Sequence, residues 1–86
     1  MNLLEEIRAI LAPVSMMSEE DIMPDNNLRT DIGLDSFGTM DAVASLEDKY
    51  GINIADEQIS MFITVKDIMD YVKHNTSPAT IAEEKL

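Results

Sequence analysis

The chain has 86 residues, and its 17 acidic residues against 6 basic ones give a net charge of −11 at pH 7. Charge of this sign disfavours nucleic acids and anionic membrane surfaces as partners, and it favours basic protein surfaces. The sequence has no cysteine, which excludes disulfides, thiolate metal sites and a cysteine nucleophile. It has a single histidine. No set of residues suggests catalysis or metal binding, so we predict neither.

Hydrophobic residues make up 45% of the chain, which is enough for one folded domain, predicted over residues 1–75. No apolar stretch approaches the roughly 18 residues that a membrane-spanning helix needs. The first residues include Glu5, Glu6 and Arg8 and do not resemble a signal peptide. We therefore expect a cytoplasmic monomer without membrane insertion that begins directly at its first helix.

Apolar residues at helical spacing predict a first helix from about Leu3, with Asn2 as its cap and Pro13 ending it near Ala12. Residues 16–20 are expected to form a further turn. The long connection over residues 21–35 combines turn-forming residues with apolar ones. We interpret it as an ordered loop held to the core by its apolar side chains, Ile22, Leu28, Ile32 and Leu34.

A second helix is predicted from Asp35 or Ser36 to about Tyr50, where Gly51 ends it. The alternation at residues 52–54 hints at a strand, but the run is too short for a sheet and has no apparent partner. The apolar face of the second helix is expected to comprise Phe37, Met40, Val43, Leu46 and Tyr50.

A short helix from residue 55 or 56 to about Met61, and a last helix from Val65 to about His74 capped by Thr64, complete the predicted elements. Residues 76–86 have little to bury and are expected to form a flexible tail. The predicted fold is all-α, with three main helices and one short helix. A long ordered loop joins the first two helices.

Ser36 lies where the long loop meets the second helix. A helix N-terminus exposes unpaired N–H groups and partial positive charge, so a phosphate ester on Ser36 would occupy a site that favours anions. Asp35 opposes this somewhat, because its carboxylate is adjacent. The alternative is that Ser36 serves only as a helix N-cap, a frequent role for serine.

The segment Gly33-Leu34-Asp35-Ser36-Phe37 resembles the Asp-Ser-Leu signature of acyl carrier proteins. Three further segments look like the same family in the same order: residues 22–28, 46–54 and 64–71. The resemblance covers most of the chain, from Leu3 to about Asn75. It implies an acyl-carrier-protein-like bundle that catalyses nothing itself. It also implies that Ser36 carries a 4′-phosphopantetheine arm, which a phosphopantetheinyl transferase attaches from coenzyme A.

On that resemblance, the chain is a discrete carrier protein that holds an acyl group as a thioester for fatty acid, polyketide or related biosynthesis. The implied partners are a loading ligase or acyltransferase and a downstream synthase or transferase with a basic docking patch. The run Asp35-Ser36-Phe37-Gly38-Thr39 also resembles D-alanyl carrier proteins, so an aminoacyl cargo stays open. An alternative of another class is an unmodified acidic helical adaptor that binds a basic protein.

The resemblance also implies roles for two sets of side chains. Four carboxylates on or beside the second helix would dock partner enzymes, with a merely solvated acidic face as the alternative: Asp35, Asp41, Glu47 and Asp48. Six apolar residues could line an acyl pocket between the second helix and the short one, with plain core packing as the alternative: Met40, Val43, Leu46, Ile54, Ile59 and Phe62.

Overall fold

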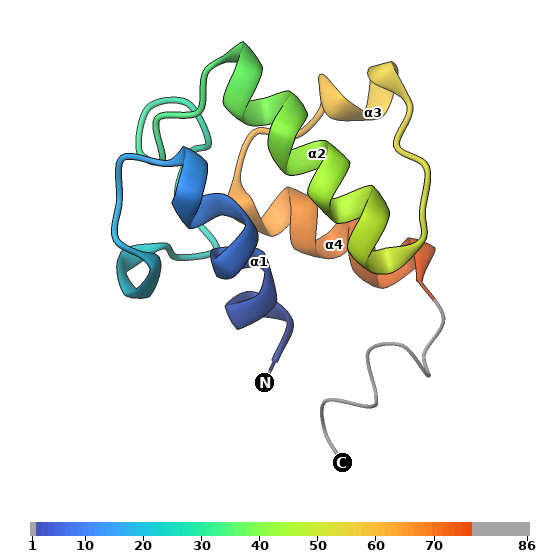
Figure 1. The fold of residues 1–86 in the computed structure, drawn as a ribbon, viewed down its shortest axis with the longest axis horizontal. Coiled ribbons are helices and arrows are strands. Elements are labelled where there is room, and N and C mark those ends of the chain that lie inside the picture. The colour runs from blue at the N-terminus through green and yellow to red at the C-terminus, as the bar shows by residue number, and fades with distance from the viewer. Residues whose placement is uncertain (1, 77–86) are drawn as a thin grey trace.

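The computed structural model describes residues 2–76, which form an all-α fold, as predicted (Figure 1). Two short 3-10 turns, at Ala12–Val14 and Glu19–Asp21, lie in the chain between the first two α-helices. The predicted flexible tail, residues 76–86, lies outside the described residues except for Thr76. The four α-helices within the described range are α1 (Leu3–Leu11), α2 (Ser36–Tyr50), α3 (Asp56–Ile59) and α4 (Val65–Asn75).

Reciprocal side-chain caps start two of the helices, at the residues that the sequence predicted. The Asn2 side chain accepts from Glu5 N at 2.9 Å, and Glu5 Oε2 accepts from Asn2 N at 3.2 Å. At α4 the same exchange joins Thr64 and Asp67. The backbone N–H groups of Thr64 and Ile63 both donate to the Asp67 carboxylate and hold its pKa below its usual range.

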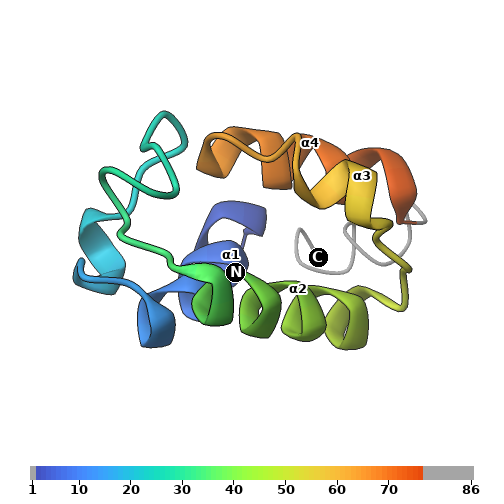
Figure 2. The same ribbon diagram turned by 90° about the horizontal axis from the view of Figure 1, so that it is seen from above.

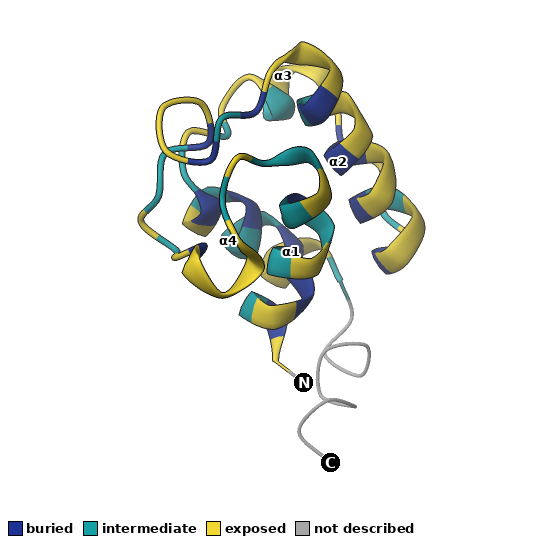
Figure 3. Ribbon diagram, turned by 60° about the vertical axis from the view of Figure 1, so that its left-hand side comes forward, coloured by how far each residue is buried: buried dark blue, intermediate teal, exposed yellow. Residues whose placement is uncertain are grey.

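The core lies between helices that face one another across the molecule. Figure 2 shows α2 along one side and α3 and α4 along the other, and α1 contacts both α2 and α4. Buried residues gather on the inward faces of these helices (Figure 3). Apolar burial of this kind supplies most of the stabilisation of a small helical domain. The side chains that are essentially inaccessible to solvent are Ile7, Leu11, Ile22, Ile32, Leu46, Val65 and Val72.

The apolar face predicted for α2 is correct only in its second half. Val43, Leu46 and Tyr50 are buried, but Phe37 is 88% exposed and Met40 is 55% exposed. The reason is the helical repeat. Each residue advances about 100° around the helix axis, so two side chains nine residues apart point in roughly opposite directions. Phe37 therefore points away from Leu46, nine residues later.

The long connection is ordered by its own hydrogen bonds and by side chains from elsewhere. Arg8 Nε donates to the carbonyl of Ile22 at 2.6 Å, and Leu28 N donates to the carbonyl of Ile63 at 2.9 Å. An isolated antiparallel bridge joins Asn27 to Thr64. The hint of a strand at residues 52–54 was wrong, since this segment has no strand pairing. The predicted turn at residues 16–20 lies slightly later, at Glu19–Asp21.

Candidate functional site

Asp35, and not Ser36, caps the N-terminus of α2. The Asp35 Oδ1 atom accepts a 2.7 Å hydrogen bond from Gly38 N, and Ser36 is the first helical residue. Ser36 is exposed, and its hydroxyl makes no hydrogen bond to any other residue in the range 2–76. The capping alternative for Ser36 is therefore wrong, and the hydroxyl stands at a helix N-terminus, whose partial positive charge favours an anion.

A tight turn at Gly33 delivers this serine to the surface. Gly33 has a φ of +82°, in the left-handed region that favours glycine. Met16 N donates to the carbonyl of Ile32 at 2.8 Å, which fixes the start of the turn. The Met16 side chain covers Gly33 so closely that a Cβ atom there would lie 2.6 Å from Met16 Sδ. The approach to Ser36 thus needs a glycine for its conformation, and a Cβ atom there would also displace the exposed Met16 side chain.

A cavity of about 600 Å³ lies between α2, the α3 region, α4 and the long connection. Polar residues from three segments stand on its wall, among them Arg29, Thr39 and Asp56. Apolar residues form most of its lining, which is the usual composition of a site for an apolar ligand. These apolar residues are Leu28, Leu34, Met40, Ala42, Val43, Leu46, Ile59, Phe62, Ile63 and Ile68.

The six residues suggested for an acyl pocket do not all reach this cavity. Ile54 is buried in the core at 7% exposure and is not part of the lining. Phe62 packs edge-on against Tyr71, with ring centroids 5.6 Å apart, so one wall is braced from α4. The five that line the cavity are Met40, Val43, Leu46, Ile59 and Phe62.

Several lining residues were not foreseen as such from the sequence. Leu28 and Leu34 were expected only to hold the long connection to the core, and the structure shows that they also form part of the cavity wall. Ile63 is 57% exposed and Ile68 is buried, so the wall spans from the surface to the core. The only sequence signal for them is apolar character, which every core residue shares.

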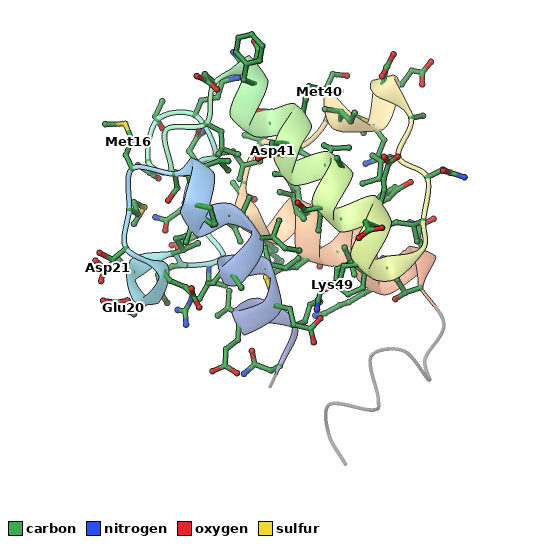
Figure 4. The ribbon with its side chains drawn as sticks, in the orientation of Figure 1. Met16, Glu20, Asp21, Met40, Asp41 and Lys49 are labelled. Atoms are coloured by element: carbon green, nitrogen blue, oxygen red, sulfur yellow. The ribbon has the colours of Figure 1, made fainter. Side chains whose placement is uncertain are left out.

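The four carboxylates suggested for docking have different surroundings. Asp41 and Asp48 are exposed on α2 and seven residues apart, so they share one face of the helix. Figure 4 shows Asp41 on the part of α2 that faces the viewer. Asp35 is engaged as the helix cap. Glu47 is half-buried, and its Oε2 atom accepts a 2.8 Å hydrogen bond from Ile54 N, which ties the segment after α2 back onto the helix.

Residues 2–76 contain no cluster of three or more His, Cys, Asp or Glu side chains that could hold a metal ion. In the same range, every helix is too short or too polar to cross a lipid bilayer.

Comparison with known proteins identifies the family. The sequence model described as "Phosphopantetheine attachment site" matches residues 5–72. Acyl carrier proteins from Helicobacter pylori strains G27 and HPAG1 are each 31% identical over 75 residues, 87% of this chain and 96% of theirs. The acyl carrier protein of Enterococcus faecalis, at 27% identity, superposes with a TM-score of 0.72 over 85% of this chain and 92% of its own.

A solved structure of the apo doublet acyl carrier protein from prodigiosin biosynthesis shares the fold at 20% identity, with a TM-score of 0.69. The match covers 85% of this chain and 36% of that one. The matches in sequence place the chain in the family of acyl carrier proteins, which are non-catalytic and carry 4′-phosphopantetheine. The chain belongs to this family.

Proposed function

We propose that Ser36 is the residue of this carrier to which 4′-phosphopantetheine is attached. The observation that supports it most is the exposed Ser36 hydroxyl at the N-terminus of α2. Asp35 caps this helix, so the hydroxyl is not used as a cap. The backbone N–H groups and dipole at this helix end favour the phosphodiester. When bound, the group supplies a thiol on a long flexible tether, which holds cargo as a thioester.

The cavity favours an acyl cargo. Its apolar lining would shelter a hydrocarbon chain, and each methylene removed from water contributes about 0.8 kcal/mol. An aminoacyl cargo, the alternative suggested by residues 35–39, would make little use of apolar walls. We therefore propose that the cargo is an acyl group of fatty acid, polyketide or related biosynthesis.

Partner enzymes would approach the exposed face of α2. Asp41 and Asp48 carry free carboxylates there, and a basic surface on a loading or receiving enzyme would complement them. The phosphopantetheinyl transferase, the loading ligase or acyltransferase and the downstream synthase or transferase would all use this face. Tethering then raises the effective concentration of the cargo at each docked enzyme.

The test is the intact mass of the full chain after incubation with coenzyme A, Mg²⁺ and a broad-specificity phosphopantetheinyl transferase. We expect the wild type to gain one phosphopantetheine and Ser36→Ala to gain none. Ser45→Ala is the matched control, because Ser45 is another exposed serine of α2, and it should be modified like the wild type. Modification of folded Ser36→Ala, or no modification of the wild type, would contradict the proposal and favour an unmodified adaptor.

A further inference from the structure

Met40 separates two hollows on either side of the second turn of α2. It lines the large cavity described above, and it also lines a more open hollow on the outer face of the helix. No other residue is common to the two linings. Figure 4 shows the Met40 side chain reaching from α2 toward α3. The outer hollow is formed by Val14, Phe37, Gly38, Met40, Asp41 and Ala44.

The spacing along α2 places Met40 between Ser36 and the interior of the cavity. Residues 36, 40 and 43 follow one another at steps of four and three, so they share one side of the helix. Exposure falls along this row from 55% at Met40 to 5% at Val43 and 1% at Leu46. A chain tethered at Ser36 that enters the cavity along this row must therefore pass Met40.

The direction of the side chain reinforces this position. Side chains of a helix lean toward its N-terminus, so Met40 extends over the turn that begins with Ser36. Methionine is unbranched and flexible, and it can change rotamer at low cost where packing is loose. At 55% exposure, Met40 is packed on one side only.

We propose that Met40 is a positioning residue that gates the passage of the acyl chain between the cavity and the outer face of α2. With the chain inside, the Met40 side chain closes over the reacting end and keeps external nucleophiles away. When it swings aside, the two hollows become continuous and the cargo is presented at the surface. This inference rests on the proposed attachment of the arm to Ser36, and it adds which residue controls access to the cargo.

The experiment compares the full chain loaded with an octanoyl arm and with an acetyl arm, each verified by intact mass before use. Hydroxylamine then cleaves the thioester, its nitrogen attacking the carbonyl to form a hydroxamate while the thiol leaves. We expect the octanoyl form of Met40→Ala to be cleaved about fivefold faster than the octanoyl wild type. The reason is that a smaller fraction of the variant molecules would hold the thioester sheltered from hydroxylamine. The acetyl forms should be cleaved alike, because an acetyl group has too little apolar surface to be held in the cavity.

Two variants separate gating from general effects. Met61→Ala is the matched control, because Met61 is 65% exposed, lies just after α3 and lines neither hollow, so its octanoyl form should behave like the wild type. Met40→Leu keeps apolar bulk and should restore most of the protection. In the wild type, the methyl resonance of Met40 should shift between the acetyl and octanoyl forms, and that of Met61 should not.

Equal cleavage rates for octanoyl Met40→Ala and octanoyl wild type would overturn the gate while leaving the arm on Ser36 intact. Faster cleavage of the acetyl and octanoyl forms alike would also overturn it, because that pattern reports a loosened fold. Failure of the wild type to take up any arm would overturn both this inference and the proposed function.

Discussion

The hydroxyl of Tyr50 donates a 2.7 Å hydrogen bond to Oε1 of Glu6, a residue 44 positions earlier, and both side chains are buried. Lys49 Nζ stands 3.6 Å from the same Glu6 oxygen, and Figure 4 shows Lys49 at the α1-facing end of α2. This contact closes the end of α2 against α1. A buried carboxylate needs such partners, because burying it without them would be strongly unfavourable.

We expect Tyr50→Phe to lower the free energy of unfolding by about 1–3 kcal/mol, because it leaves the buried Glu6 carboxylate one donor short. Chemical denaturation monitored by circular dichroism measures the loss. Tyr71→Phe is the matched control, since Tyr71 donates a longer bond of 3.2 Å to the Asn53 carbonyl at an exposed site. Equal losses in the two variants would contradict the importance of the Glu6 contact.

Alkaline pH should weaken the fold through Tyr50. Burial, the hydrogen bond to Glu6 and the negative charge of Glu6 all raise the pKa of Tyr50 above its usual value. The folded chain thus keeps the phenol proton at a pH where the unfolded chain releases it, so stability is present below about pH 10 and falls as the pH rises above it. Tyr50→Phe should lose less stability than the wild type between about pH 9 and pH 11. Equal losses of stability in the wild type and Tyr50→Phe over this pH range would show that ionisation of Tyr50 is not the cause.

Gly33→Ala should destabilise the turn before Ser36 more than Gly51→Ala destabilises the end of α2. Both glycines have positive φ, which costs alanine about 1–2 kcal/mol. A Cβ atom at Gly33 also collides with Met16, whereas at Gly51 it meets nothing within 4 Å. Thermal unfolding of the two variants gives the difference, and adding Met16→Ala to Gly33→Ala should recover part of it. Absence of any recovery would show that the collision with Met16 is not the cause.

Replacing Asp41 and Asp48 by lysine should slow modification by the transferase about tenfold at low salt, since a basic partner loses both attraction and orientation. The control is Glu19→Lys with Glu20→Lys, which changes the net charge equally on an exposed turn away from α2. Equal slowing by both pairs would show that only net charge matters. Glu47→Gln should act mainly on stability, because its carboxylate accepts from Ile54 N.

Local signals in the sequence were sufficient for the boundaries of α1, α2 and α4 to within about one residue, whereas α3 ends at Ile59 and not at about Met61 as predicted. Asn2, Thr64 and Gly51 each act on the backbone within a few residues, so their capping roles can be predicted without knowing the fold. The start of α2 was predicted to within one residue, and the structure then assigned the cap to Asp35 and left Ser36 free.

Contacts between distant residues could not be predicted in this way. Nothing in the sequence pairs Glu6 with Tyr50, because the contact depends on how α1 crosses α2. Glu47 was interpreted as a docking carboxylate because the family resemblance implies docking by acidic residues of the second helix, and only the fold brings Ile54 N within 2.8 Å of it. Ile54 is apolar like the cavity residues, and only packing decides which of them line the space and which fill the core.

Asp35 caps α2, whereas the neighbouring Ser36 is the proposed attachment site, and this separation affects how the carrier is modified. Because the helix is held by one residue and the chemistry is proposed for its neighbour, a substituent can be added to Ser36 or removed from it without withdrawing any bond that the scaffold needs. The start of α2 would therefore be the same in the unmodified, modified and loaded molecules. Each enzyme would then have to distinguish them by the arm, the cargo and the side chains that the cargo moves, and not by the backbone at the attachment site.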